Sequence, residues 1–549
     1  MMNYLDWLVI ILYVGMVIGL ALYLTRTQRD IEDYYLAGKR IKWWQSGAST
    51  MATQLGAISF ISAPAFVALK DGGGLKWLCY EFGVPLALIL VMGIIIPVLH
   101  RHNYISIYEY LEHRFDGGTR SLVSLLFQLG RGLATAVAVL AGGLIVSTAL
   151  NMSTASAIIL IGVVTLIYDV LGGIRVVILS DFLQMMIIVA GIMICGGVAI
   201  SLVGWNQAWT ALDPERFLIL DFKRWGFSQE GSYAFWPMTI GGFFLYASYY
   251  GCDQSQVQRE LTVGSVNDVR KSLMVNALGR FPLVLLYSMM GVFVGAIFSS
   301  PEALPQVGSV MGMDSEAVSA LLERDPDRML PLFIFSYLPH GVIGFIFVAI
   351  IAALMSSLDS GLNSLSAVTM RDFYQRYVTE PKDDRHYLIV SKLITLFWGI
   401  FCIAAALGFA AFGEATRQTT IVLINAVGSL LYGPILAAFL LGMFTKRVGA
   451  HSVKLGVVAG IFVNIYFWNP LNLWPTAPIS WLWWNFTGFA AAIGVALLAA
   501  NVEADQMVHK STMIQPLEAS SKKWKAIYML VVGYFFFIIL VSHLIQQAG

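Results

Sequence analysis

The stretch ALMSSLDSGLNSLS, residues 353–366, places a string of hydroxyl groups and one carboxylate inside a segment otherwise apolar enough to cross a bilayer. The hydrocarbon core offers no water, so polar side chains at that depth face protein, a cavity or an ion. Ser356, Ser357 and Ser360 recur at helical spacings, and Asp359 lies beside them. We predict a surface of hard oxygen atoms suited to an alkali cation, with small-residue packing as the alternative for the serines alone.

The overall composition indicates an integral membrane protein. The chain has 549 residues, of which 58% are hydrophobic and 12% are charged, and its mean hydropathy is +0.73. A soluble globular protein carries roughly twice that charged fraction. The net charge of +1 disfavours a nucleic-acid partner, because phosphate binding needs a concentrated basic surface. The four cysteines lie in apolar segments without metal-ligand spacing and are therefore predicted to be buried thiols.

Hydropathy over windows of about 19 residues predicts about fourteen transmembrane spans in an all-α protein. The spans are expected at 7–25, 44–69, 76–98, 121–150, 154–174, 178–203, 236–256, 273–299, 331–369, 388–411, 418–444, 452–470, 482–500 and 526–546. If the N-terminus is outside, the inside loops hold most of the 34 Lys and Arg residues, as the positive-inside rule requires. We therefore predict a single domain, 1–549, in the cell membrane (the inner membrane of a bacterium), with both termini outside.

Several function classes lack the residues that they need. No soluble domain and no GxxxxGK[ST] motif is evident, so neither a nucleotide nor a nucleic acid is an expected partner. The eight histidines contain no HExxH arrangement, and we predict that the protein is not an enzyme. No obligate protein partner is indicated. The expected partners are the lipid bilayer, a small solute and an ion.

Five stretches carry a resemblance to a known family. They are WWQSGASTMATQLGAISF (43–60), DVLGGIRVVILSDFLQ (169–184), CDQSQVQREL (252–261), ALMSSLDSGLNSLSAVTMRDFYQ (353–375) and SLLYGPILAAFLLGMFTKR (429–447). In this order they resemble the sodium/solute symporter family, whose members carry glucose, inositol, proline, iodide or sialic acid.

The resemblance implies a core of two inverted five-helix repeats with broken helices. The repeats would cover about 44–203 and about 236–444, with peripheral helices at about 7–25 and 452–546. The implied function is sodium-coupled import of a small organic solute, a sugar or sugar acid, by alternating access. A proton-coupled symporter of a carboxylate and a non-transporting membrane sensor on the same body are the alternatives.

The resemblance also implies a sodium site. The broken second span would supply the backbone carbonyls of Ala52 and Leu55. The ninth span would supply the carbonyl of Ala353 and the hydroxyls of Ser356 and Ser357. Neutral oxygens around a monovalent ion allow binding that is strong enough to load and weak enough to release.

Three further residues are candidates for a second sodium site or for the sodium exit path. Asp181 matches a family acid close to that path, and some relatives bind a second sodium with this acid and hydroxyls one turn further along the ninth span. The matching positions are Asp359 and Ser360 beside Ser356. Asp359 departs from the family pattern, because relatives often have a hydroxyl there. It could strengthen a second site, pair with a cationic side chain or carry a proton, and the sodium stoichiometry stays open.

The solute contacts implied by the resemblance lie on both repeats. They are Gln54, Ser59, Tyr80, Glu81, Arg131, Tyr246, Tyr249, Asp253 and Asn425. Tyr249 matches an aromatic inner gate of sugar carriers. Arg131 matches the position that sialic acid carriers use to hold the substrate carboxylate, but Glu81 could instead pair with it, which would suit a neutral polyol.

Overall fold

The computed structural model describes residues 2–25, 30–102, 104–150, 152–228, 231–300, 303–378, 380, 382–411, 420–469, 474–475, 479–502 and 522–549. Within these ranges the secondary structure is helical, and the sole β-type contact is an isolated bridge between Ile41 and Val263. The protein is therefore all-α, as predicted.

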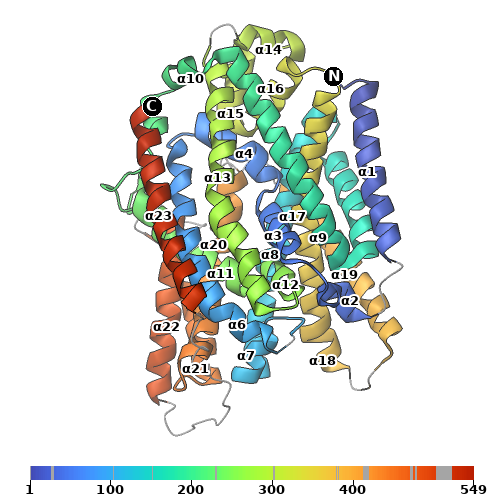
Figure 1. Ribbon diagram of the computed structural model, residues 1–549, viewed down its shortest axis with the longest axis vertical. Helices are drawn as coiled ribbons and strands as arrows, with labels where there is room; N and C mark the ends of the chain where they lie inside the picture. Colours follow the sequence, from blue (N-terminus) through green and yellow to red (C-terminus); the bar gives the residue numbers. More distant parts are fainter. Residues whose placement is uncertain are drawn as a thin grey trace.

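The α-helices follow one another along the chain with short connections (Figure 1). They are α1 (Tyr4–Thr25), α2 (Ile31–Leu36), α3 (Trp43–Gln54), α4 (Ala57–Ala68), α5 (Gly83–Leu90), α6 (Ile96–His100), α7 (Glu109–Arg114), α8 (Gly117–Leu150), α9 (Thr154–Val203), α10 (Trp205–Ala211), α11 (Gly242–Cys252), α12 (Gln254–Leu261), α13 (Val266–Phe298), α14 (Ala303–Met311), α15 (Ser315–Arg324), α16 (Met329–Tyr337), α17 (Val342–Val368), α18 (Gln375–Tyr377), α19 (Asp384–Ala411), α20 (Thr420–Phe444), α21 (Ala450–Trp468), α22 (Trp484–Val502) and α23 (Lys522–Ala548). Short 3₁₀ or π-helical segments are η1 (Ala37–Lys39), η2 (Leu75–Phe82), η3 (Val91–Ile95), η4 (Pro214–Phe217), η6 (Pro237–Gly241), η7 (Pro326–Arg328), η8 (Thr369–Tyr374) and η9 (Trp481–Trp483).

Among the described residues, 11 helices are long and apolar enough to cross a membrane, or up to 12 if the bent pair α3 and α4 is one span. Two interruptions explain most of the difference from the fourteen predicted spans. Residues 154–174 and 178–203 both lie in α9, which is divided at Gly173 (φ 58°). The predicted span 236–256 contains α11, which has only 11 residues before the chain breaks at Asp253. The multi-pass helical architecture is confirmed, and the number of spans depends on how these interrupted segments are counted.

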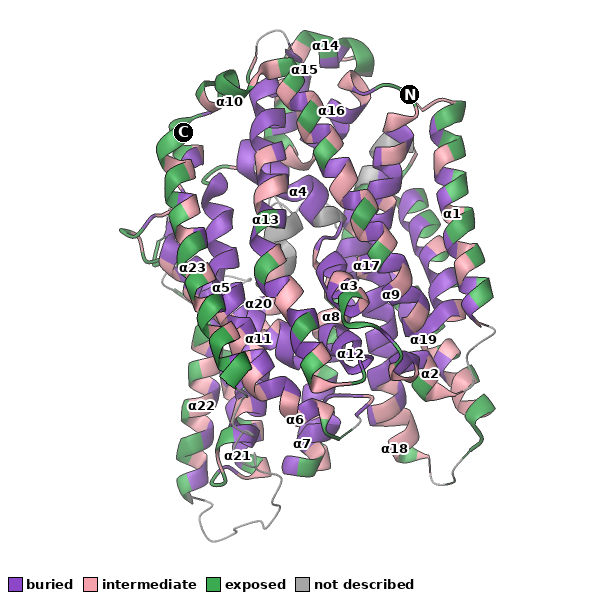
Figure 2. Ribbon diagram, viewed as in Figure 1, coloured by how far each residue is buried: buried purple, intermediate pink, exposed green. Residues whose placement is uncertain are grey.

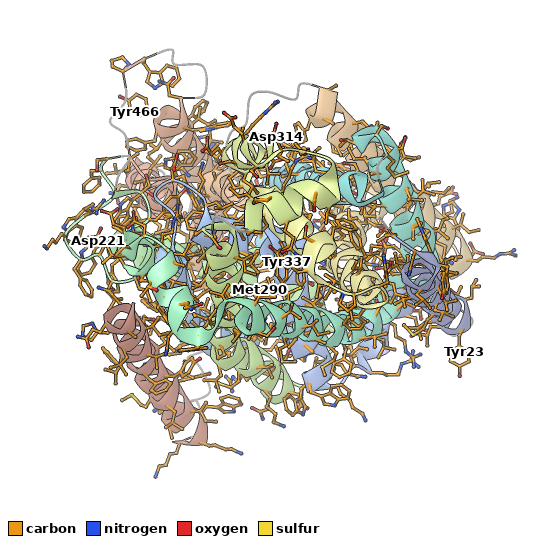
Figure 3. All side chains as sticks on the ribbon, turned by 90° about the horizontal axis from the view of Figure 1, so that it is seen from above. Tyr23, Asp221, Met290, Asp314, Tyr337 and Tyr466 are labelled. Atoms are coloured by element: carbon orange, nitrogen blue, oxygen red, sulfur yellow. The ribbon has the colours of Figure 1, made fainter. Side chains whose placement is uncertain are left out.

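The helices form an inner group that the others surround. The apolar window of α17 is 78% buried, whereas that of the C-terminal helix α23 is 17% buried. Figure 2 shows the same contrast, with purple on α3 and α17 and green along α23. Viewed from above, Tyr23 of α1 and Tyr466 of α21 lie at opposite edges of the bundle (Figure 3). Such outer faces are suited to lipid contact.

The chain ends and the connecting helices show how the bundle is oriented. Both termini lie at one end, together with α10, α14 and α15, whereas α7 and α18 lie at the other (Figure 1). Asp6 of α1 accepts hydrogen bonds from the backbone N–H groups of Gly341 and Gly344 at 2.6 and 2.9 Å. A side chain of α1 thus satisfies donors that the first turn of α17 leaves free, and it fixes the helix that carries the serine string.

Candidate functional site

The break between α3 and α4 is the first element of the site. α3 ends at Gln54, Leu55 follows with φ −90° and ψ 53°, and Gly56 precedes α4 in an extended conformation. The N–H of Leu55 donates to the carbonyls of Met51 and Ala52, and the two helices meet at 51°. Because the last turn of a helix leaves carbonyls without helical partners, the break frees backbone oxygen atoms inside the bundle.

Two serines of α17 reach this break. The hydroxyl oxygen of Ser356 lies 3.4 Å from the carbonyl oxygen of Ala52 and 3.0 Å from that of Ala353. The hydroxyl oxygen of Ser357 lies 3.3 Å from the Ala353 carbonyl oxygen and 3.5 Å from that of Thr53. The two spans that were predicted to share an ion are therefore in direct contact.

Gly56 makes this contact possible. A β-carbon at residue 56 would lie 2.4 Å from the hydroxyl oxygen of Ser357, which is closer than any ordinary contact. Among the predicted ligands, the hydroxyl oxygen of Ser356 lies 3.4 Å from the carbonyl oxygen of Ala52 and 3.0 Å from that of Ala353. Oxygen atoms that coordinate one hard cation, each at about 2.4 Å from the ion, lie at similar distances from one another. The group of neutral oxygens therefore fits a sodium ion.

Asp181 and Ser360 belong to a second polar cluster beside the first. The hydroxyl oxygens of Thr53 and Ser360 are 3.0 Å apart. The guanidinium of Arg259, which is 1% exposed, donates from Nη2 to Asp181 at 3.1 Å and also to Ser360. Its Nε donates to Ser49 at 2.7 Å. Arg259, which was not predicted as a site residue, therefore contacts both Asp181 and Ser360. The resemblance assigned these two residues to a possible second sodium site.

Asp359 has hydroxyl partners. It is fully buried and accepts hydrogen bonds from Tyr168 and, at 3.3 Å, from Ser360. The nearby guanidinium of Arg259 makes its ion pair with Asp181 instead. Of the roles that the sequence left open for Asp359, a direct ion pair with a cationic side chain does not form in this structure.

A cavity of about 150 Å³ lies next to the break between α3 and α4. Its wall comes from α3, α4, η2, α8, α11, α13, α17 and α20. The lining residues are Thr53, Gln54, Gly56, Ser59, Trp77, Tyr80, Arg131, Ala134, Thr135, Ala138, Leu245, Tyr246, Tyr249, Arg280, Tyr287, Leu354, Ser357, Asn425 and Tyr432. All the predicted solute residues except Glu81 and Asp253 are among them.

Two ion pairs lie against this cavity. Arg131 pairs with Asp253, and its guanidinium carbon is 5.4 Å from the centre of the Tyr249 ring. Arg280 of α13 donates to Glu81 through Nε at 2.9 Å and through Nη2 at 3.3 Å. The alternative in which Glu81 pairs with Arg131 is therefore wrong. The chain break between α11 and α12 places Asp253 beside Arg131 instead.

Hydrogen bonds hold most of the other predicted solute residues in place. They join Tyr80 to Asn425 (3.3 Å), Tyr246 to Glu81 (2.9 Å), Tyr249 to Gln256 (2.9 Å) and the hydroxyl of Ser59 to the carbonyl of Gln54 (3.1 Å). Side chains fixed in this way present a preformed wall to a ligand.

Arg280 is a cavity residue that was not predicted. Its Nη1 atom and both amide atoms of Gln54 are buried and have no hydrogen-bond partner within the described part of the chain. A buried polar group without a partner is costly, so these atoms are suited to contact a bound solute. The signal was present in the sequence, because VNALGRFPLV places a lone arginine in an apolar run, as QLGRG does for Arg131.

Known proteins are similar to this chain in sequence and in fold. The sequence profile of the sodium:solute symporter family matches residues 34–460, which is most of the chain. The chain belongs to the sodium:solute symporter family. Members of this family are transporters, and sodium is the coupling ion.

The symporter has full-length relatives. It is 29% identical to the sodium/sialic acid symporter NanT of Aliivibrio fischeri over 85% of this chain and 88% of that protein. It is 28% identical to the sodium/glucose cotransporter of Vibrio parahaemolyticus over 86% of this chain and 87% of that protein. Its fold matches the substrate-bound outward-open structure of a sodium-coupled sialic acid symporter with a TM-score of 0.77 at 23% identity, over 91% and 98% of the two chains. The predicted family, helical membrane fold and sodium coupling are confirmed.

Proposed function

We propose that this symporter uses the sodium gradient to import a sugar acid or a similar hydroxylated carboxylate. The observation that carries this proposal is the charge of the cavity wall. Arg131 and Arg280 line the cavity, and no Asp or Glu belongs to its described lining. Their carboxylate partners, Asp253 and Glu81, do not line it. A wall that offers guanidinium N–H donors favours an anionic solute rich in acceptor oxygens.

The tyrosines of the cavity wall support a sugar-like solute. Five tyrosines line the cavity: Tyr80, Tyr246, Tyr249, Tyr287 and Tyr432. Their rings offer flat apolar faces against which a sugar ring packs, and their hydroxyls offer donors and acceptors. The relatives named for sialic acid and for glucose support the same class of solute.

A neutral sugar or polyol is the second candidate. It is favoured by the ion pairs Arg131–Asp253 and Arg280–Glu81, because each guanidinium already has a carboxylate partner in the protein. The four side chains together contribute no net charge. A neutral solute would then leave no buried charge without compensation.

The sodium ligands in this proposal are the carbonyls of Ala52, Leu55 and Ala353 and the hydroxyls of Ser356 and Ser357. Their grouping around the α3–α4 break supports the assignment. Thr53 and Gln54, which both line the cavity, lie between Ala52 and Leu55, so a sodium ion bound by these two carbonyls holds the backbone that presents both side chains to the solute. By linkage, the solute must raise the affinity for sodium by the same factor as sodium raises the affinity for solute.

We assign one sodium ion per transport cycle. Arg259 supports this number, because its guanidinium bonds both Asp181 and Ser360 and supplies a positive charge there. A second sodium ion at that place would have to displace a fully buried ion pair, which is costly.

The remaining assignments concern topology. Both termini lie at one end of the bundle (Figure 1), and the excess of Lys and Arg in alternate loops supports an orientation with that end outside the cell membrane. We assign a single membrane domain with inverted repeats at about 44–203 and about 236–444. Transport proceeds without chemical conversion of the solute and without an obligate protein partner.

Uptake into proteoliposomes tests this function. A sodium gradient, and then a proton gradient, would be applied with matched acid and neutral solutes such as galacturonate and galactose. Sodium-dependent uptake should be inhibited by the acid far more than by the neutral sugar. Equal competition by both would favour the neutral candidate, and equal uptake with choline in place of sodium would contradict sodium coupling.

Two arginine variants in the same assay test whether Arg280 contacts the solute. Arg280→Lys should lose most of the affinity for the acid, because an ammonium group cannot reproduce the planar contact of a guanidinium. Arg328→Lys is the matched control, since Arg328 pairs with Asp325 at the surface, with exposed fractions of 37% and 40%. The same solute affinity in Arg280→Lys as in the control would remove Arg280 from the solute site.

A further inference from the structure

Asp169 of α9 is a buried carboxyl group without a partner. Its exposed fraction is 0%, and neither of its carboxyl oxygens has a hydrogen-bond partner within the described ranges. The two other acids nearby differ in this respect, because Asp181 accepts from Arg259 and Asp359 accepts from Tyr168. An ionised carboxylate buried without donors is very costly. Asp169 is therefore neutral, with a bound proton, in this conformation.

The charges around Asp169 lead to the same conclusion. Its charge interacts with those of Arg259, Asp181 and Asp359. Three carboxylates and one guanidinium would leave two negative charges uncompensated. The sodium ion at the break compensates one of them, and a proton on Asp169 removes the other. Glu260 of α12 also faces this region, because its charge interacts with that of Arg259, and it accepts hydrogen bonds from Thr50 and Ser272. The other titratable groups are tyrosines: Tyr34 and Tyr35 of α2, Tyr168 of α9, and Tyr13 of α1, which faces Asp181 and Asp359.

A chain of polar side chains leads from the solute cavity toward Asp169. Thr53 lines the cavity, and its hydroxyl oxygen is 3.0 Å from that of Ser360. Ser360 donates to one oxygen of Asp359 at 3.3 Å, and Tyr168 donates to the other. These hydrogen bonds end at Tyr168, the residue before Asp169, because neither carboxyl oxygen of Asp169 has a hydrogen-bond partner in the described ranges. Hydroxyl and carboxyl groups in series can pass a proton along their hydrogen bonds, and the last step to Asp169 has to pass through water.

On its other side, Asp169 is covered by the short helix α2. Gly173, one turn further along, has φ 58°, and a β-carbon there would lie 2.8 Å from both a ring carbon and the carbonyl oxygen of Tyr34. The hydroxyl of Tyr35 lies 2.8 Å from that of Ser366, which ties α2 to α17. Both tyrosines are fully buried. Movement of α2 away from α17 would therefore give water access to Asp169.

We propose that Asp169 is a proton-binding site that loads and unloads in each transport cycle, so that one proton enters the cell with sodium and the solute. A hydronium ion in the cavity supplies the proton: one of its O–H bonds breaks, leaving water, and an O–H bond forms on the Asp169 carboxylate. When α2 moves away, that O–H bond breaks and water on the inside accepts the proton as hydronium, which leaves Asp169 as a carboxylate. This site goes beyond sodium-coupled import and does not depend on which solute is carried.

Proton movement can be measured directly in proteoliposomes that contain a pH-sensitive dye. The assay applies a sodium gradient and a solute whose uptake depends on sodium. Addition of the solute should acidify the interior, and uptake should fall once the outside pH rises above the pKa of Asp169, because above its pKa the protonated fraction of an acid falls about tenfold per pH unit. In Asp169→Asn the acidification per solute imported should be lost. Asp268→Asn, at a surface ion pair with Lys271, should behave as the parent.

Two results would overturn the proposal. One is the absence of internal acidification in the parent protein during sodium-driven uptake, a result that needs no variant and so holds even if Asp169→Asn fails to fold. The other is acidification per solute in Asp169→Asn equal to that of the parent. Asp169→Glu keeps a carboxyl group at this position and should retain acidification, which separates the loss of a titratable group from general damage.

Discussion

Substitution of Gly56 by alanine tests the proposed sodium site through a single oxygen atom, the hydroxyl oxygen of Ser357. The new β-carbon would lie 2.4 Å from the hydroxyl oxygen of Ser357, but 3.6 Å from the β-carbon of that serine and 3.7 Å from the carbonyl oxygen of Ala353. Only the first of these contacts is too short. The backbone at Gly56, with φ −71°, is open to alanine, so strain in the main chain is not the cause of the effect. The hydroxyl of Ser357 must move.

The expected magnitude follows from that displacement. Forcing an extra carbon into a packed site costs about 1 to 3 kcal/mol. Because about 1.4 kcal/mol corresponds to a tenfold change, the sodium concentration for half-maximal uptake should rise about 5- to 150-fold. Ser357→Ala removes the same ligand without adding volume and should also raise that concentration strongly.

The double variant Gly56→Ala with Ser357→Ala tests whether the effect of Gly56→Ala acts through the hydroxyl of Ser357. In the Ser357→Ala background the nearest neighbour of the new β-carbon would be 3.6 Å away, an ordinary contact, so Gly56→Ala should then add almost nothing. The assay is sodium-dependent uptake in proteoliposomes, with thermal unfolding in detergent as a check on folding. An effect of Gly56→Ala as large in the double variant as in the parent would refute this reasoning.

Other perturbations test the ion pairs, the α1–α17 contact and the linkage. Glu81→Gln leaves the Arg280 guanidinium without its carboxylate, which should cost about 3 to 5 kcal/mol of stability; thermal unfolding should show that Arg280→Gln added to it restores part of the loss. Asp253→Asn should weaken solute binding more than stability, because Arg131 lines the cavity; the reverse order would make that pair structural. Asp6→Ala leaves the part-buried N–H of Gly341 and the buried N–H of Gly344 unpaired at the start of α17; the buried one should cost about 1 to 3 kcal/mol, which should lower the unfolding temperature without changing the solute preference. Calorimetry should find equal factors for the effect of sodium on solute affinity and of solute on sodium affinity, and unequal factors would contradict the linkage.

The difference between the predicted and the observed number of spans shows which features of the fold the sequence did not reveal. Hydropathy locates apolar segments well, because each residue contributes to membrane transfer independently of its neighbours. It does not show that the helical run of α9 continues through the turn at Gly173, or that the segment ending at Cys252 breaks after 11 residues. Those features depend on backbone angles that neighbouring helices stabilise.

The sequence by itself determined the class of protein, and it marked the stretch in which we propose the sodium site. The serine string of α17 and the weak point at Gly56 are local patterns: polar atoms in an apolar segment need a partner, and a glycine beside small residues permits a break. Tertiary structure decided the partners. Arg131 meets Asp253 across 122 residues, Arg280 meets Glu81 across 199, and Arg259 meets Asp181 across 78. An arginine in an apolar span requires some carboxylate, but which one it contacts depends on the rotation and packing of whole helices, and no local pattern encodes that.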